Sequence, residues 1–320
     1  MKKFFKKHRK SILISILIFL ILILVLILYL FKMWLNINDA ADNSYEKTDK
    51  KREAPVAINA VSSESKSVLI LGMDKKSEGA QRTDAIIVMT FNPKTNQGEF
   101  VRIPRDLYVE TDNYKGKINA LYEKEGLSSL INVLQEYLGV PITNYAKTDF
   151  NGLENMVDQV GGVDINSNIV IDNSNNYNLG SKIHVKKGKN HLNGKEALGY
   201  SRIRYIDNDI ERGNRQGEVI KALINKILSP QQIVKVDKNA QEFSKYIKTD
   251  IKISDAIHLA NSINAKPQIK QSKFKWDEAQ SNGGDIVYLK PGERKKLSDN
   301  LRENLGIKKL NAMTPIVEKP

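Results

Sequence analysis

Apolar and polar residues are distributed unevenly along the chain, and the longest apolar run lies near the N-terminus. From Ser11 to Phe31 the sequence contains 21 nearly unbroken apolar residues. A helix rises about 1.5 Å per residue, so this run would be about 30 Å long, which matches the hydrocarbon core of a bilayer. We therefore predict one transmembrane helix over residues 11–31.

The residues on either side of this run predict its orientation. Six cations precede it, and positive charge favours the cytoplasmic side; they are Lys2, Lys3, Lys6, Lys7, Arg9 and Lys10. A cleaved signal peptide is the alternative, but the run is too long and no Ala-x-Ala-like site follows it. We expect a single-pass protein of the cell membrane, with residues 1–10 as a cytoplasmic tail and the catalytic domain outside.

After the predicted span, residues 32–66 are polar and poorly periodic, which predicts an extracytoplasmic stalk. The pattern then changes. Ser67–Met73 and Asp84–Phe91 are continuous apolar runs, typical of strands buried on both faces. A third strand is predicted at Glu99–Ile103.

Helical spacing and short strand signals alternate through the rest of the chain. The predicted helices are Leu127–Leu138, Asn151–Val160, Leu192–Tyr200, Glu211–Leu228, Asp255–Ile263 and Glu293–Leu305, and the strand candidates are Val163–Asn166, Ile169–Ile171 and Asp285–Leu289. Strands interleaved with helices predict an α/β domain over residues 67–315, with a central mixed β-sheet flanked by helices on both faces. The order of the strands does not follow from the pattern.

Composition narrows the chemistry. The chain has no cysteine, which excludes disulfides, thiolate catalysis and cysteine-based metal sites. Its net charge is +13, and the six N-terminal cations leave +7 on the rest. A basic outer domain suits anionic lipids, phosphates or wall polymers. Nucleic acid is not an expected partner, because the predicted topology keeps the domain away from it.

Two aspartates stand at neighbouring strand ends. Asp74 follows a strongly apolar strand, and Asp84 opens the next one, two residues after Arg82. Carboxylates that face each other across a sheet end suit a hard cation such as Mg²⁺. The alternative is two turn aspartates that share no partner.

Arginines mark two further places. Arg105 follows a strand that ends at Pro104, and an ordinary surface pair with Asp106 is the alternative there. Farther on, Arg212 and Gln216 stand four residues apart, so a helix would place them on one side.

This second stretch uses arginine for all its cations from Arg202 to Arg215, whereas solvated faces usually mix lysine and glutamate. If Arg202 and Arg204 are extended, their side chains project from one face. Because guanidinium groups bind phosphate oxygens bidentately and keep their charge, the stretch favours an anion site.

The motifs GMD, RTD, IPRD, KIN and RIRYIDNDIERGNRQ, in this order, resemble the LytR–CpsA–Psr family of wall-polymer ligases. The resemblance is strong from Ser67 to Leu228 and holds only by position beyond that. It implies a phosphotransferase that moves a teichoic-acid-like or capsular polymer from a polyprenyl-pyrophosphate carrier to peptidoglycan, at the C6 hydroxyl of N-acetylmuramic acid. The implied partners are that carrier-linked polymer, peptidoglycan and the lipid membrane.

The resemblance also implies residue roles. Mg²⁺, or Mn²⁺ in its place, would be held by Asp74 and Asp84. The pyrophosphate would be surrounded by Arg82, Arg105, Arg202, Arg204, Arg212 and Gln216, of which Arg105 and Arg212, with Asp84, are the expected catalytic residues. Supporting positions are Asp106, Lys117, Asn119, Asp209 and Arg215. Asp84 and Asp106 both remain candidates for the general base.

Two other functions stay open from the sequence. A polyprenyl-pyrophosphate hydrolase would use the same charges with water as the acceptor. A non-catalytic binder or regulator of cell-wall intermediates would need the arginines but gain nothing from carboxylates beside the anion. Histidine catalysis is not expected, because His8, His184, His191 and His258 form no ligand-like cluster.

Overall fold

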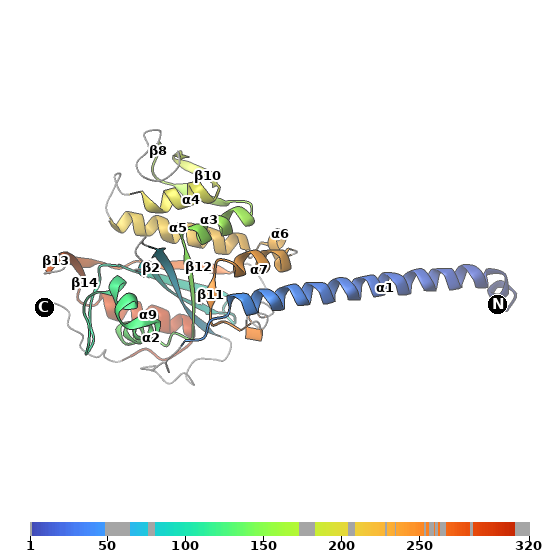
Figure 1. Ribbon diagram of the computed structural model, residues 1–320, viewed down its shortest axis with the longest axis horizontal. Coiled ribbons are helices and arrows are strands. Elements are labelled where there is room, and N and C mark those ends of the chain that lie inside the picture. Colours follow the sequence, from blue (N-terminus) through green and yellow to red (C-terminus); the bar gives the residue numbers. More distant parts are fainter. Residues whose placement is uncertain are drawn as a thin grey trace.

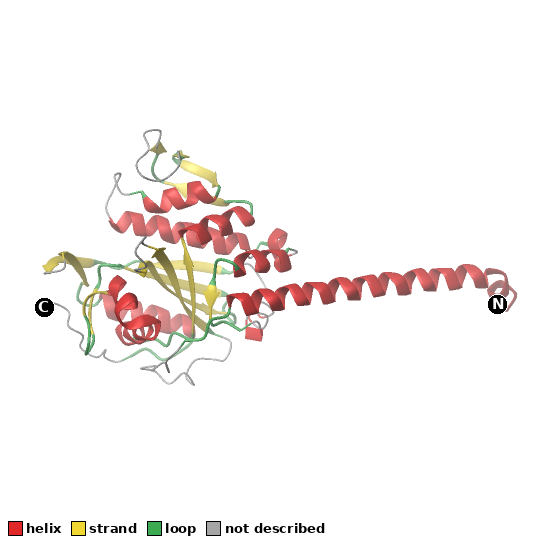
Figure 2. Cartoon of the chain, in the orientation of Figure 1, coloured by secondary structure: helices red, strands yellow, loops and turns green. Residues whose placement is uncertain are grey.

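The protein consists of one long N-terminal helix followed by an α/β domain (Figures 1 and 2). The computed structural model describes residues 2–48, 65–75, 81–172, 183–203, 209–227, 229–233, 235–252, 254–255, 259, 262, 267–281 and 284–310. The predicted helix at Asp255–Ile263 therefore falls mostly outside the described residues.

Helix α1 (Lys2–Ser44) projects far from the domain in Figure 1. From Leu20 onward it is long and apolar enough to cross a bilayer, and its large apolar side chains from Leu20 to Phe31 are exposed. Exposed apolar residues around a whole helix are stable only in an apolar surrounding. The single N-terminal apolar helix expected from the sequence is thus present.

The first part of the predicted stalk is helical and joins the domain. α1 continues through Ser44 and packs against α7 (Val236–Ser244). Just after it, the main-chain N–H of Glu46 donates to the carbonyl of Thr249 at 2.7 Å. Residues 49–64 of the predicted stalk lie outside the described residues.

A mixed sheet forms the centre of the domain, as the sequence predicts. Its order is β11 (Lys248–Thr249), β6 (Asn144–Asp149), β1 (Lys66–Lys75), β2 (Gln81–Asn92), β3 (Gln97–Ile103) and β12 (Gln268–Ser272). β1 pairs with β6 and β3 with β12 in parallel, whereas the remaining pairs are antiparallel.

Helices α2 (Ile118–Leu138) and α9 (Glu293–Leu305) cover one face of the sheet (Figure 1). Leu130 and Leu134 of α2 and Leu301 of α9 belong to the main hydrophobic cluster with the apolar residues of β1, β2 and β3. The sequence predicted α2 only from Leu127, whereas in the structure it begins at Ile118 and is interrupted at Gly126, where φ is +84°. Positive φ carries no steric penalty at glycine.

The opposite face lies under α3 (Phe150–Gln159), α4 (Gly194–Arg202) and α5 (Asp209–Ile227). Ile220 and Ile224 of α5 pack against Ile87, Phe100 and Ile269 of the sheet. A separate cluster joins α3, α4 and α5 to two short paired strands, β7 (Val163–Ser167) and β10 (Gly188–Leu192). Both faces of the sheet are therefore covered, which confirms the predicted fold class.

Small elements complete the domain: α6 (Pro230–Ile233) and the hairpins β4 (Tyr108–Glu110) with β5 (Lys115–Lys117), β8 (Ile171–Asp172) with β9 (His184–Val185), and β13 (Trp276–Ser281) with β14 (Gly284–Leu289). The last of these hairpins contacts the chain that leaves β3. The N–H of Val287 donates to the carbonyl of Asp106 at 2.9 Å, so β14 is attached directly to that segment.

Candidate functional site

The site begins where β3 ends beside the start of β2. These strands are antiparallel, with Ile103 opposite Ile86, so Asp84 lies beside the chain that leaves β3. Arg105 Nη1 lies 3.4 Å from Asp84 Oδ1, and Arg105 Nε lies 3.3 Å from Asp106 Oδ2. One guanidinium therefore bridges two carboxylates.

A second cation extends this arrangement from another segment. Lys117 Nζ lies 3.0 Å from Asp106 Oδ1. We call Asp84, Arg105, Asp106 and Lys117 the charged row. Its members are partly exposed, with 22–27% of each side chain accessible, so a molecule in solution can reach them.

The main chain holds the charged row in place. The N–H of Asn119 donates to the carbonyl of Arg105 at 3.1 Å. The hydroxyl of Thr83, which neighbours Asp84, donates to the carbonyl of Asn119 at 3.3 Å. Three segments distant in sequence are thus tied together, and the structure groups Asn119 with the predicted site residues.

Helix α5 contributes a second group of predicted residues. Gln216 Oε1 accepts a hydrogen bond from Arg102 Nε at 3.0 Å, and its Nε2 donates to the carbonyl of Ser201 at 3.4 Å. Arg212, one turn earlier, is 4% exposed. The helix can approach β3 this closely because of Gly213, where a Cβ would lie 2.4 Å from Arg102 Nη1.

Arg215 holds the end of α4. Its Nε donates to the carbonyl of Tyr200 at 3.0 Å, and its Nη2 donates to that of Ile203 at 2.8 Å. Carbonyls at a helix C-terminus lack partners within the helix, and cationic side chains commonly satisfy them. The buried Arg215 therefore ties α4 to α5 through main-chain contacts.

Arg202 differs from the extended conformation considered from the sequence, because it is the last residue of α4. The helix starts at a capping box, in which Asn193 and Glu196 bond each other's main-chain N–H groups. The guanidinium of Arg202 lies 4.6 Å from the ring centroid of Phe150, a cation–π distance. Arg204 lies outside the described residues, as does the side chain of Asp209.

The remaining predicted residues lie on β1 and β2. Arg82 is 46% exposed, and its Nε lies 3.8 Å from Glu123 Oε2 on α2. Asp74 pairs with Arg82 through the backbone register of β1 and β2, while its side chain is outside the described set. Within the described residues, no three His, Cys, Asp or Glu side chains gather as a metal-binding group.

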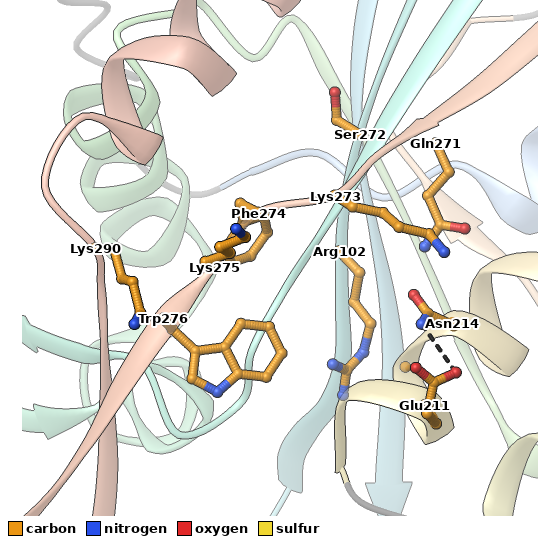
Figure 3. Close-up of a pocket in the computed structure, with 11 residues that line it drawn as sticks. Arg102, Glu211, Asn214, Gln271, Ser272, Lys273, Phe274, Lys275, Trp276 and Lys290 are labelled. Carbon is orange, nitrogen blue, oxygen red and sulfur yellow. Dashed lines mark hydrogen bonds between the residues drawn. The ribbon is translucent and has the colours of Figure 1, made fainter.

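The sequence prediction missed one part of this region, a cavity of about 420 Å³ beside Arg102 (Figure 3). We call it the hairpin cavity, because residues at and before β13 form one of its walls. A usable signal exists in the sequence: lysines and aromatic residues alternate from Lys273 to Trp276.

The comparisons with known proteins agree on one family. A model of the LytR_cpsA_psr family matches residues 31–303. The polyisoprenyl-teichoic acid–peptidoglycan teichoic acid transferase TagU of Bacillus licheniformis is 31% identical over 309 residues, covering 94% of this chain and 97% of that protein. The polyisoprenyl-teichoic acid–peptidoglycan teichoic acid transferase TagV of Bacillus subtilis is 34% identical over 239 residues, covering 72% of this chain and 61% of TagV.

Solved structures show the same fold. The crystal structure of B. subtilis TagV matches with a TM-score of 0.66 and 30% identity, covering 77% of this chain and 99% of TagV. TagT bound to LI-WTA matches with a TM-score of 0.65 and 26% identity, covering 81% and 95% of the two chains.

Proposed function

Because this chain belongs to the LytR_cpsA_psr family, we propose that it transfers a teichoic-acid-like or capsular polymer from a polyprenyl-pyrophosphate carrier to peptidoglycan. The names of relatives that align over most of this chain support the reaction class. The observation that carries the proposal is the bridge of Arg105 between Asp84 and Asp106 at the end of β3. A simple anion-binding surface would gain nothing from these carboxylates.

The proposed acceptor is the C6 hydroxyl of N-acetylmuramic acid. Its oxygen attacks the phosphorus nearest the polymer, and a new P–O bond forms there. The bond from that phosphorus to the bridging oxygen breaks, and polyprenyl phosphate leaves. The hydroxyl proton passes to Asp84 or Asp106, which keeps atoms and charge balanced.

Positioning and charge neutralisation do most of the work in phosphoryl transfer. Arg105 is placed to bind phosphate oxygens, since its neighbouring carboxylates fix its plane and leave it partly exposed. Arg212 and Gln216 approach from α5, and we assign them to the same pyrophosphate. We also assign Arg82, Arg202 and Arg204 to the proposed anion site, and this assignment rests on the family resemblance alone.

Mg²⁺ suits this site, and we propose Asp74 and Asp84 as its protein ligands. Mg²⁺ usually binds one or two carboxylates together with substrate phosphates, so it requires no larger acidic cluster. Asp84 offers a partly exposed carboxylate. Asp74 lies on β1 opposite Arg82 of β2, and Arg82 comes two residues before Asp84. When bound, the cation would neutralise charge that develops on the phosphate oxygens.

The test uses the full-length protein in detergent with a lipid-pyrophosphate-linked sugar and peptidoglycan fragments, with and without Mg²⁺. Mass spectrometry should detect a metal-dependent sugar-phosphate adduct on muramic acid. Release of the sugar phosphate into water alone would indicate a hydrolase. Binding without turnover, with a substrate that TagU accepts, would contradict enzymatic function.

A further inference from the structure

The hairpin cavity has two unlike walls (Figure 3). Phe274 and Trp276, at the start of the C-terminal hairpin, stand on one side. Arg102 of β3 and Glu211 and Asn214 of α5 stand on the other. A volume of about 420 Å³ lies within the range of about 300–1,000 Å³ that is usual for small-molecule sites.

The aromatic wall offers apolar faces in a fixed position. The rings of Phe274 and Trp276 lie 5.6 Å apart at 55°, and both pack with one side against the main hydrophobic cluster. Each remains half-buried and borders the cavity. An aromatic face held in this way gives large contact area at little entropic cost, and it suits the C–H face of a sugar ring.

The rest of the lining is strongly basic. It contains four cations, Arg102, Lys273, Lys275 and Lys290, against one carboxylate, Glu211. The three lysines are exposed around the aromatic wall. Lys290 Nζ also lies 3.0 Å from Asp277 Oδ1, and the cations still outnumber the carboxylates when Asp277 is included. Such a rim attracts anions and steers them toward the cavity.

The cavity shares its framework with the charged row. Arg102 precedes Arg105 by three residues on the same segment, and its Nε donates to Gln216. From the other side, Val287 of the hairpin is hydrogen-bonded to the carbonyl of Asp106. A chain of sugars that reached the charged row could therefore continue into the cavity.

We propose that the hairpin cavity is a subsite for an anionic glycan, in which Trp276 and Phe274 stack on a sugar ring and the lysine rim binds its negative charge. The inference rests on the proposed function and deepens it. Two substrates share this chemistry: the phosphate-rich polymer of the donor, and the peptidoglycan acceptor, whose muramic acid carries a carboxylate.

The chain has two tryptophans, so Trp34→Phe leaves Trp276 as the single fluorescent reporter in the full-length protein. This variant in detergent is titrated with an N-acetylglucosamine–N-acetylmuramic acid fragment and, separately, with a glycosylated glycerol phosphate oligomer. We expect saturable change in Trp276 emission with one probe, which identifies the source as acceptor or donor. A neutral chitin oligomer should bind at least fivefold more weakly.

A lysine pair and a matched control test the rim. Lys275→Gln with Lys290→Gln should weaken binding of the responding probe at least fivefold, whereas Lys238→Gln, an exposed lysine on α7, should leave it unchanged. No saturable change with either probe, or equal affinity in the lysine pair and the control, would overturn the subsite. These substitutions keep both rings against the core, so their effect does not depend on a repacked fold.

The results expected if the proposed function is wrong differ from those expected if the subsite is wrong. Arg105→Ala should abolish transfer but leave the Trp276 titration unchanged, because Arg105 does not line the cavity. If the unsubstituted protein binds a probe at Trp276 and transfers nothing under any condition, the subsite stands and the transferase proposal fails. Transfer with normal kinetics by the Trp276→Leu variant would remove the subsite and keep the transferase.

Discussion

At the scale of single residues, Arg105 is the side chain that joins the two carboxylates of the charged row. Its two ion pairs, at 3.4 and 3.3 Å, fix the plane of the guanidinium, while 23% of the side chain stays exposed to solvent. Rigid, preoriented cations are the groups that stabilise developing negative charge most effectively. We therefore expect Arg105 to contribute more to transfer than to stability.

Arg105→Ala should reduce the transfer rate by at least about 100-fold, since one preorganised donor to the reacting oxygens is lost. The free energy of unfolding should change by no more than about 1 kcal/mol, because these pairs are partly exposed. Mass-spectrometric transfer assays and thermal unfolding measure the two effects. Arg212→Ala should also abolish transfer, and full activity in both variants would contradict the site assignment.

Asp84 tests the proposed metal site. Asp84→Asn preserves the size of the side chain but removes the charge that a hard cation requires. We expect transfer to fall and the Mg²⁺ concentration for half-maximal activity to rise at least about tenfold. Asp112→Asn, on an exposed turn, is the matched control. An unchanged Mg²⁺ titration would show that Asp84 is not a metal ligand.

The residues of the charged row are all among the site candidates that the sequence indicated, but the sequence did not predict which contacts those residues make. Asp84 lies near the start of β2, and Arg105 and Asp106 follow the end of the paired strand β3. Lys117 reaches Asp106 from β5, which belongs to a separate two-stranded sheet. Arg215 illustrates the limit. Its spacing correctly suggests a helix, but only the fold shows that it bonds the carbonyls at the end of α4.

At the scale of elements, the approach of α5 to β3 depends on Gly213. A Cβ there would lie 2.4, 2.7 and 2.9 Å from Arg102 Nη1, Cζ and Cδ, so the buried guanidinium or the helix must shift. Alanine also favours a helix over glycine, by about 1 kcal/mol. The two effects oppose each other, and overpacking in a buried position usually costs more, about 1–3 kcal/mol.

Gly213→Ala should therefore destabilise the protein and break the Arg102–Gln216 hydrogen bond. Thermal unfolding of Gly213→Ala, Arg102→Ala and the double variant forms a cycle that measures the coupling. We expect the double variant to be more stable than the sum of the single effects predicts. Lys221→Ala, on the exposed side of α5, controls for helix propensity. If the effects of the two single substitutions on the free energy of unfolding simply add in the double variant, the contact between a Cβ at position 213 and Arg102 does not lower stability.

Apolar strands were predictable, and polar strands were not. β1 and β2 carry the continuous apolar runs of a buried sheet centre. β6 reads NYAKTD and β12 reads QIKQS, and neither differs from a loop by composition. They enter the sheet because parallel pairing with β1 and β3 satisfies their main-chain groups, which a local pattern does not contain.

At the scale of the whole molecule, orientation relative to the membrane decides which substrates are accessible. Six cations precede the apolar segment of α1, and positive residues beside a membrane span favour the cytoplasmic side. A reporter enzyme that works only outside the cytoplasm should therefore be active when it is fused after Leu310. A reporter that works only in the cytoplasm should be inactive at the same position. The same fusion to a chain with the six cations replaced by glutamine provides the control. Cytoplasmic activity of the unaltered fusion would contradict access to peptidoglycan.

The C-terminal end of α1 and the residues just after it are held to the domain by hydrogen bonds and an ion pair. We call these contacts the clamp. Lys147 Nζ lies 2.6 Å from Glu46 Oε1, and the Tyr145 hydroxyl donates to the carbonyl of Glu46 at 2.6 Å. Lys248 Nζ donates to the carbonyl of Asn43 at 2.6 Å, close to the end of α1. These contacts link α1 to strands of the central sheet, so the charged row keeps a fixed direction relative to the helix.

The clamp predicts a narrow distance distribution between helix and domain. Because the chain lacks cysteine, Leu35→Cys and Lys238→Cys place two spin labels at unique positions. Lys147→Met should broaden the distribution, since it removes the ion pair and keeps the apolar stem. Lys245→Met, which removes an exposed pair with Glu242, should leave it narrow.

Alkaline pH should have the same effect as Lys147→Met. Burial acts to lower the pKa of Lys147, but its hydrogen bonds to Glu46 and Tyr122 outweigh burial and raise that pKa above the ordinary value. A raised lysine pKa stabilises the clamp fully below the unfolded value of about 10.4, and the contribution is lost as pH rises through the folded value. The unsubstituted distribution should therefore stay narrow at neutral pH and broaden only above about pH 10.4. Equal widths for Lys147→Met and the unsubstituted chain at neutral pH would show that α1 is held by its packing on α7 alone.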